Sequence, residues 1–171
     1  MLSPVLLTHW TRALIFAART DDGDLIEEIT RRIARQGDAL DLIAVCRVIA
    51  DTAQRALLAL YGPPDAARGE VWALEYLDDP DEDPETLFAA RLVTAYANRD
   101  NDHVTAFVAA VAAAPLEQRA ESLWSLVAYA VGLEAQATRQ GSRPYGRNTA
   151  ITYLDVQTTD QTPPPDERNP R

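Results

Sequence analysis

The stretch LVTAYANRDNDHVTAFVAAVAA, Leu92 to Ala113, predicts two helices that meet at a short polar elbow. Apolar residues recur at three- and four-residue spacing on both sides of the polar run from Asn98 to Asp102. Asp100 or Asp102 can accept hydrogen bonds from the free N–H groups at the start of the second helix. We therefore interpret these acids as helix caps rather than as metal ligands.

A similar stretch, LIFAARTDDGDLIEEITRRIA, runs from Leu14 to Ala34, with Asp22 or Asp24 as the expected cap. A shift of 78 positions aligns the two stretches, and the identical pairs are Leu14 and Leu92, Ala17 and Ala95, Asp22 and Asp100, Asp24 and Asp102, and Ala34 and Ala112. Gly23 and Asn101 stand at the same place in the two elbows, and both tolerate the backbone conformations of a turn. The match predicts a tandem duplication with a period near 78 residues.

The whole chain predicts an all-α fold of about seven helices. We expect helices at 4–19, 24–36, 38–61, 65–77, 86–99, 102–114 and 116–140. Two three-helix units, residues 1–61 and 86–140, would pack together into one domain of residues 1–140, linked by the helix at 65–77 and an acidic connector at 78–85. In the last helix, Leu123, Trp124 and Val127 are expected to face the core.

Residues 141–171 are expected to form an extended, flexible tail. Pro, Thr, Gln and charged residues dominate there, and helical periodicity is lost. One piece, 150–156, alternates as a strand does. Two interpretations of the tail stay open: it orders on a partner by adding a strand to it, or it frays.

Charge and composition exclude several classes of protein. The 171 residues carry a net charge of −10, and residues 62–102 hold 3 Arg against 11 Asp and Glu, a balance of −8. A strongly acidic chain repels nucleic-acid phosphate, so direct nucleic-acid binding is not expected. No apolar run could span a membrane, and MLSPVLLTHW lacks the basic leader of a secretory signal, so we expect a cytoplasmic protein.

The sequence offers little for catalysis, metals or cofactors. It contains two histidines, one cysteine and no HExxH, G-x-S-x-G or glycine-rich phosphate motif. Asp79, Asp81 and Asp83 alternate as calcium ligands do, but Pro84 and Ala90 stand where an EF-hand loop needs glycine and a carboxylate. Cys46 lies in an apolar helix and is expected to be a buried packing residue. We therefore predict no catalytic, cofactor-binding or metal-binding residue.

The expected function is that of a non-enzymatic helical interaction or assembly protein. Its partner would be another protein, and a basic one would suit its charge; a homo-oligomer stays open. The binding surfaces would be the groove between the units, the acidic segment and the tail, and the candidate residues are Asp78, Asp79, Asp81, Glu82, Asp83, Arg143, Tyr145, Arg147 and Tyr153. One alternative is an acidic regulator or decoy of a basic nucleic-acid-binding protein. Another is a small-ligand-binding bundle or small enzyme.

Overall fold

A computed structural model describes residues 1–74, 84–140 and 151–155, and within them the chain is an all-α fold of six helices. The helices are α1 (Pro4–Arg19), α2 (Gly23–Gln36), α3 (Ala39–Tyr61), α4 (Pro84–Ala97), α5 (Asn101–Ala113) and α6 (Leu116–Gln140). A 3-10 turn at Ala66–Arg68 leads into strand β1 (Glu70–Leu74), which pairs with β2 (Ile151–Asp155).

Helix boundaries follow the capping residues. Ser3 accepts a hydrogen bond from the Leu6 N–H, and Pro4 follows as the first helical residue of α1. Asp38 and Asp41 cap α3 reciprocally, each carboxylate accepting the other residue's N–H at 2.9 and 3.1 Å. Gly62 ends that helix with a φ of 76°, which glycine adopts without steric cost.

The two elbows share one backbone geometry. Asp22 accepts the Leu25 N–H, and Asp100 accepts the His103 N–H, both at 3.1 Å. The residue before each cap is left-handed, with φ of 56° at Asp21 and 61° at Arg99. The capping prediction is thus confirmed, but the role given to the glycine and asparagine is wrong. Gly23 and Asn101 are the first helical residues, so the turn conformation falls on the residues before the caps.

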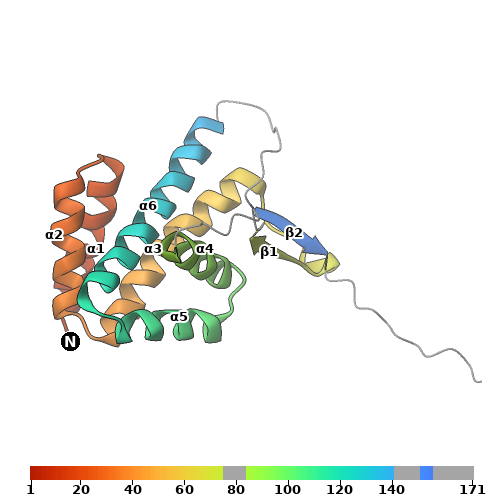
Figure 1. Cartoon of the computed structure of the whole chain (residues 1–171). Helices are drawn as coiled ribbons and strands as arrows, with labels where there is room; N and C mark the ends of the chain where they lie inside the picture. Colours follow the sequence, from red (N-terminus) through yellow and green to blue (C-terminus); the bar gives the residue numbers. More distant parts are fainter. Residues whose placement is uncertain (75–83, 141–150, 156–171) are drawn as a thin grey trace, which may run out of the picture.

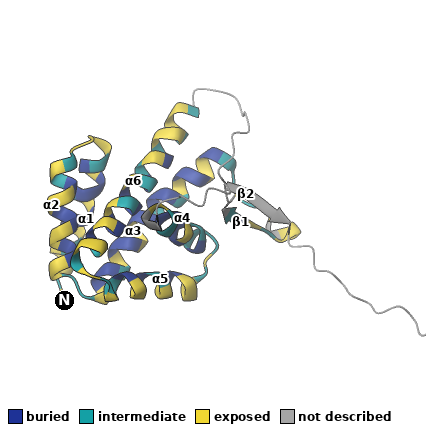
Figure 2. Cartoon of the chain, in the orientation of Figure 1, coloured by how far each residue is buried: buried dark blue, intermediate teal, exposed yellow. Residues whose placement is uncertain are grey.

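Helices α3 and α6 form the centre of the molecule, where they pack along each other (Figure 1). Helix α2 packs on α6, α5 packs on α3, and α1 and α4 each contact both central helices. The buried faces turn toward one another and the exposed faces outward (Figure 2). The largest fully buried side chains include Leu14, Ile33, Leu42, Ile49, Leu57, Leu92, Leu123 and Leu126. Burial of this apolar surface is the main source of stability for such a fold.

The helix predicted at 65–77 does not form over its described residues, 65–74. Asp65 caps only a single turn, accepting the Ala67 N–H at 3.0 Å, and Gly69 then turns the chain with a φ of 70°. The following residues form β1, which pairs antiparallel with β2 so that Trp72 lies opposite Tyr153. The strand predicted at 150–156 is therefore confirmed over 151–155, and it adds to this chain's own β1.

Asn98 fixes β1 to the helices. Its side-chain oxygen accepts the Trp72 N–H, and its side-chain nitrogen donates to the Trp72 carbonyl, both at 2.8 Å. The Trp72 ring is 3% exposed and packs edge-on against Tyr61, with ring centroids 6.3 Å apart. Because Asn98 uses both backbone groups of Trp72, it covers the edge of β1 opposite to β2. A two-stranded sheet is marginal alone, and this docking stabilises it.

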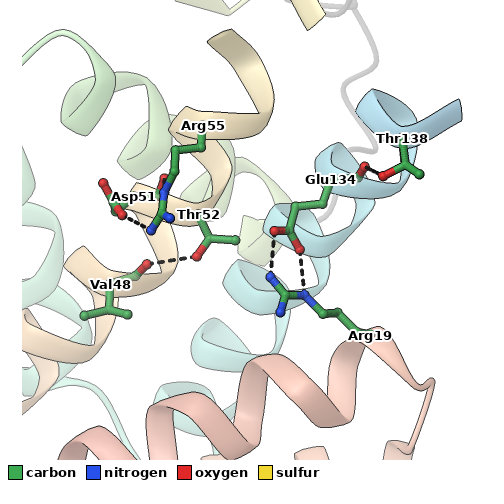
Figure 3. A network of polar contacts seen from close by, with 7 residues as sticks. All are labelled: Arg19, Val48, Asp51, Thr52, Arg55, Glu134 and Thr138. Carbon is green, nitrogen blue, oxygen red and sulfur yellow. Dashed lines mark hydrogen bonds and ion pairs between the residues drawn. The ribbon is translucent and has the colours of Figure 1, made fainter. Parts of the chain in front are cut away.

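A salt bridge joins the first helix to the last. Arg19 donates to both carboxylate oxygens of Glu134, at 2.9 and 2.7 Å, and Figure 3 shows this pair between α1 and α6. The hydrogen bond to Glu134 raises the pKa of Arg19. Asp51 and Arg55 in the same view pair within one helix. Of these two ion pairs, the one between Arg19 and Glu134 therefore joins distant parts of the chain.

Candidate functional site

A hollow of about 230 Å³ lies between α2 and α6, one helix from each predicted unit. Glu27, Thr30 and Arg31 line it from α2; the α6 lining residues are Glu117, Ala120, Glu121 and Trp124. Each set follows the three- and four-residue spacing that places side chains on one helix face. Thr30 forms the floor, since it is 1% exposed and its hydroxyl donates to the Ile26 carbonyl at 2.9 Å.

Trp124 forms one wall of this hollow and is 37% exposed. The prediction that it faces the core is wrong. A methyl group placed on Gly23 would lie 3.6 Å from the far edge of the indole ring, so the ring reaches the first turn of α2. A partly exposed tryptophan beside a hollow is typical of interaction sites, because a ring adds much contact area with few rotatable bonds.

The charges around the hollow do not balance. Glu27 and Arg31 form an ion pair within α2, with N and O 2.5 Å apart. Glu117 and Glu121 are exposed and one turn apart on α6, and neither forms an ion pair with any described residue. Two like charges at this spacing repel each other in the free protein. The hollow therefore carries two uncompensated carboxylates next to an aromatic face.

Two larger hollows are lined in part by charges that already have partners. One, of about 500 Å³, follows the surface of α2, where Glu27 pairs with Arg31 and Glu28 with Arg32. The other, of about 470 Å³, is lined by Arg19 and Glu134, which pair with each other, and by Arg55. The hollow beside Trp124 shares the Glu27–Arg31 pair, but of the three it alone adds a partly exposed aromatic ring and two carboxylates without an ion pair to a described residue, so we favour it.

Most of the partner-binding residues predicted from the sequence lie outside the described part of the chain. These are Asp78, Asp79, Asp81, Glu82 and Asp83 in the acidic segment, and Arg143, Tyr145 and Arg147 after α6. Tyr153 lies in β2, where its backbone stands opposite Trp72. The α2/α6 hollow is lined by other charged residues, which were not among the predicted binding residues. The sequence feature that could have identified this hollow is the pair Glu117 and Glu121, which lie four residues apart on a predicted helix.

Cys46 and His103 have structural roles. Cys46 is fully buried, as predicted, and burial raises the pKa of its thiol to about 12. His103 contacts the capping carboxylate of Asp100 through Nδ1 at 2.6 Å, on the surface. The backbone N–H of His103, and then its ring, hold the pKa of Asp100 below the ordinary value. These contacts stabilise the start of α5.

Within 1–74, 84–140 and 151–155, no group of three or more His, Cys, Asp or Glu is arranged to hold a metal ion. Over the same residues, none of the helices combines the length and apolar character that crossing a bilayer requires. Comparison with known proteins found no matching family, no matching curated protein and no matching solved structure.

Proposed function

We propose that this chain is a non-enzymatic helical interaction protein that binds a basic segment of another protein in the α2/α6 groove. One observation carries the proposal: Trp124 is partly exposed beside the unpaired Glu117 and Glu121. A guanidinium or ammonium group could lie over the indole face while donating to the carboxylates. Arginine suits both contacts better than lysine, because its planar group stacks on the ring and donates in a fork.

We further propose that the groove joins two copies of a duplicated three-helix unit. The matching elbows support this, since left-handed Asp21 and capping Asp22 recur as Arg99 and Asp100 after the same shift of 78 positions. The contact pattern supports it as well, because α2 packs on α6 as α5 packs on α3. A duplicated unit gives a rigid frame in which a surface between copies keeps its shape.

The proposal can be tested by titrating the whole protein with a capped tetra-arginine peptide at low salt. Calorimetry would report the affinity, and the indole N–H signals in NMR spectra would report the location. We expect the Trp124 signal to shift more than those of Trp10 and Trp72, which are 8% and 3% exposed. The E117Q/E121Q double variant should bind several-fold more weakly, since each exposed ion pair contributes about 0.2–1 kcal/mol.

Asp102→Asn is the matched control for Glu117→Gln. Both residues are exposed acids in the first turn of a helix, but Asp102 lies on α5, away from the groove. The control removes the same charge and should change the affinity less than twofold. Equal weakening by both single changes, or no weakening in the double variant, would refute the groove as the binding site.

The charge distribution favours a second candidate, an acidic regulator of a basic nucleic-acid-binding protein. Residues 62–102 carry −8 of the net −10. This function predicts salt-sensitive binding that is lost when Asp78, Asp79, Asp81, Glu82 and Asp83 are neutralised together. Binding that survives this change but not E117Q/E121Q would assign the partner to the groove instead.

A further inference from the structure

The hydrogen bonds of β1 show which way its backbone groups point. Trp72 donates its N–H to the Asn98 side chain and accepts from that side chain with its carbonyl, so both groups point away from β2. The Glu70 N–H donates to the Asp65 carbonyl at 3.1 Å, so it also points away from β2. In an antiparallel pair, residues whose backbone groups face outward alternate with residues that bond the neighbouring strand. The odd-numbered residues of β1 therefore carry the hydrogen bonds to β2.

The same alternation fixes the outer edge of β2. Trp72 lies opposite Tyr153, so Tyr153 directs its N–H and carbonyl away from β1 as well. Ile151 and Asp155, two residues to either side, have the same orientation. In the described part of the chain the sheet has two strands, and it ends at β2. The outer edge of β2 thus presents the N–H groups and carbonyls of these three residues in a row.

The two edges of this sheet, which lies at one side of the helices (Figure 1), differ in their protection. The outer edge of β1 is closed at Trp72 by Asn98 and at Glu70 by the Asp65 carbonyl. The sequence of β2, ITYLD, has no lysine or proline to keep the edge from pairing, and its one charge, Asp155, lies at the end. An unprotected edge is a template for a further strand, and a two-stranded sheet is marginal without one.

We infer that β2 pairs antiparallel with β2 of a second copy of this chain, about a two-fold axis at Tyr153. In this register Tyr153 lies opposite the Tyr153 of the other copy, and Ile151 lies opposite Asp155. Each outward N–H of one strand then meets an outward carbonyl of the other. The two Asp155 carboxylates lie at opposite ends of the new ladder, so like charges are not paired. The strand is therefore complementary to itself.

The closed edge of β1 limits the assembly to two copies. Pairing uses the same edge of both chains, as a two-fold symmetric contact requires, and it produces a four-stranded sheet in the order β1-β2-β2-β1. Both outer strands of that sheet are β1, which Asn98 covers at Trp72, so the ladder does not extend to a third copy. The net charge of −10 on each chain opposes the contact, and added salt should therefore strengthen it.

Sedimentation of the whole protein at increasing concentration tests the number of copies. We expect the mass to rise from 18.8 kDa toward twice this value and no further, with tighter association at higher salt. Isotope-filtered NOE spectra of a mixed labelled sample test the register, since Thr152 of one copy and Leu154 of the other form a close pair without hydrogen bonds. A protein that stays monomeric at millimolar concentration, or that assembles without this contact, would overturn the inference.

Two variants separate backbone pairing from side-chain contacts. Tyr153→Pro removes an outward N–H and keeps the hydrogen bonds to β1, so it should weaken dimerisation roughly five- to 150-fold, for two bonds lost in each dimer. Tyr153→Val keeps the N–H and is the matched control, which should dimerise more tightly than Tyr153→Pro. Slow hydrogen exchange at the Trp72 amide would confirm that β1 stays docked in both variants. Equal weakening by the two changes would contradict a contact made by the backbone.

A charge exchange tests the two-fold axis without changing the backbone. Tyr153→Lys and Tyr153→Glu each place like charges directly opposite one another, so each variant alone should dimerise more weakly than the wild type. A mixture of the two variants should form the heterodimer, because the paired charges are then opposite. If the mixture does not recover dimerisation, residue 153 does not face its own copy and the proposed register is wrong.

Discussion

Gly37→Ala should destabilise the protein through a single backbone clash. Gly37 follows α2 with φ −78° and ψ 142°, a conformation that alanine also adopts. Its added methyl group, however, would lie 2.7 Å from the Ile33 carbonyl oxygen. The Gly37 N–H also donates to that oxygen at 2.8 Å, so relieving the contact disturbs the hydrogen bond that closes the helix.

The size of the effect follows from two opposing contributions. Overpacking of this kind costs about 1–3 kcal/mol. Replacing glycine restricts the unfolded chain, which stabilises the protein by about 0.4–1 kcal/mol. The expected net loss is on the order of 1 kcal/mol. For a chain of this length, each kcal/mol shifts the Tm by roughly 2–4 °C.

Gly132→Ala is the matched control, because the same methyl group is added with nothing within 4 Å of it. Gly132 lies inside α6 and is exposed, so alanine should stabilise the helix by about 1 kcal/mol. Thermal and urea unfolding followed by circular dichroism would measure both variants. The two changes should move the Tm in opposite directions, and a Gly37→Ala protein as stable as the wild type would refute the reasoning.

Three further outcomes are expected. Asn98→Ala removes the side chain that bonds both Trp72 backbone groups, so it should cost about 1–3 kcal/mol of stability and speed hydrogen exchange at the Trp72 amide. Asn98→Asp should keep that amide protected, because aspartate keeps the acceptor oxygen. A double-mutant cycle on Arg19 and Glu134 should give a coupling energy of about 0.5–1 kcal/mol. This coupling should fall with added salt, since Arg19 is half-exposed. The coupling energy of the Asp51–Arg55 pair should be about half as large. Asp100→Asn should lower the Tm, and the difference from the wild type should shrink as the pH falls from about 5 toward 2.5. The pKa of Asp100 is lowered from its ordinary value of 3.8 in the folded protein. The stabilising contribution of this carboxylate is therefore present above that pH and is lost as the pH falls through the folded-state pKa. A Tm difference that stays constant with pH would contradict this.

The helix boundaries could be predicted where the sequence carries a capping residue. Ser3, Asp38 and Gly62 bound helices at the positions that capping chemistry requires, and the structure confirms these boundaries. The segment after Gly62 was predicted as a helix from its Asp65 cap and the apolar residues that follow. Trp72 and Leu74, however, lie two apart, which is strand spacing, and they belong to β1. Nothing local indicates that β1 pairs with residues 151–155, since the pairing depends on where α6 delivers the chain.

The candidate site was only partly predictable. A groove between the two predicted units was expected. The residues that line the α2/α6 hollow, however, depend on how these helices are rotated against each other, and helical periodicity gives that rotation only to within about one residue. An error of one residue is enough to explain the wrong prediction for Trp124, which directly follows the fully buried Leu123 and yet is 37% exposed.

The distance along the chain between β1 and β2 has a consequence during translation. Glu70 pairs with Asp155, and Leu74 pairs with Ile151, so β1 leaves the ribosome long before its partner strand is made. At about 5–20 residues per second, the interval is on the order of 4–16 s. The Asn98 side chain is synthesised early in that interval and can cover one edge of β1, while the other edge stays open to nascent neighbours until the C-terminal strand emerges.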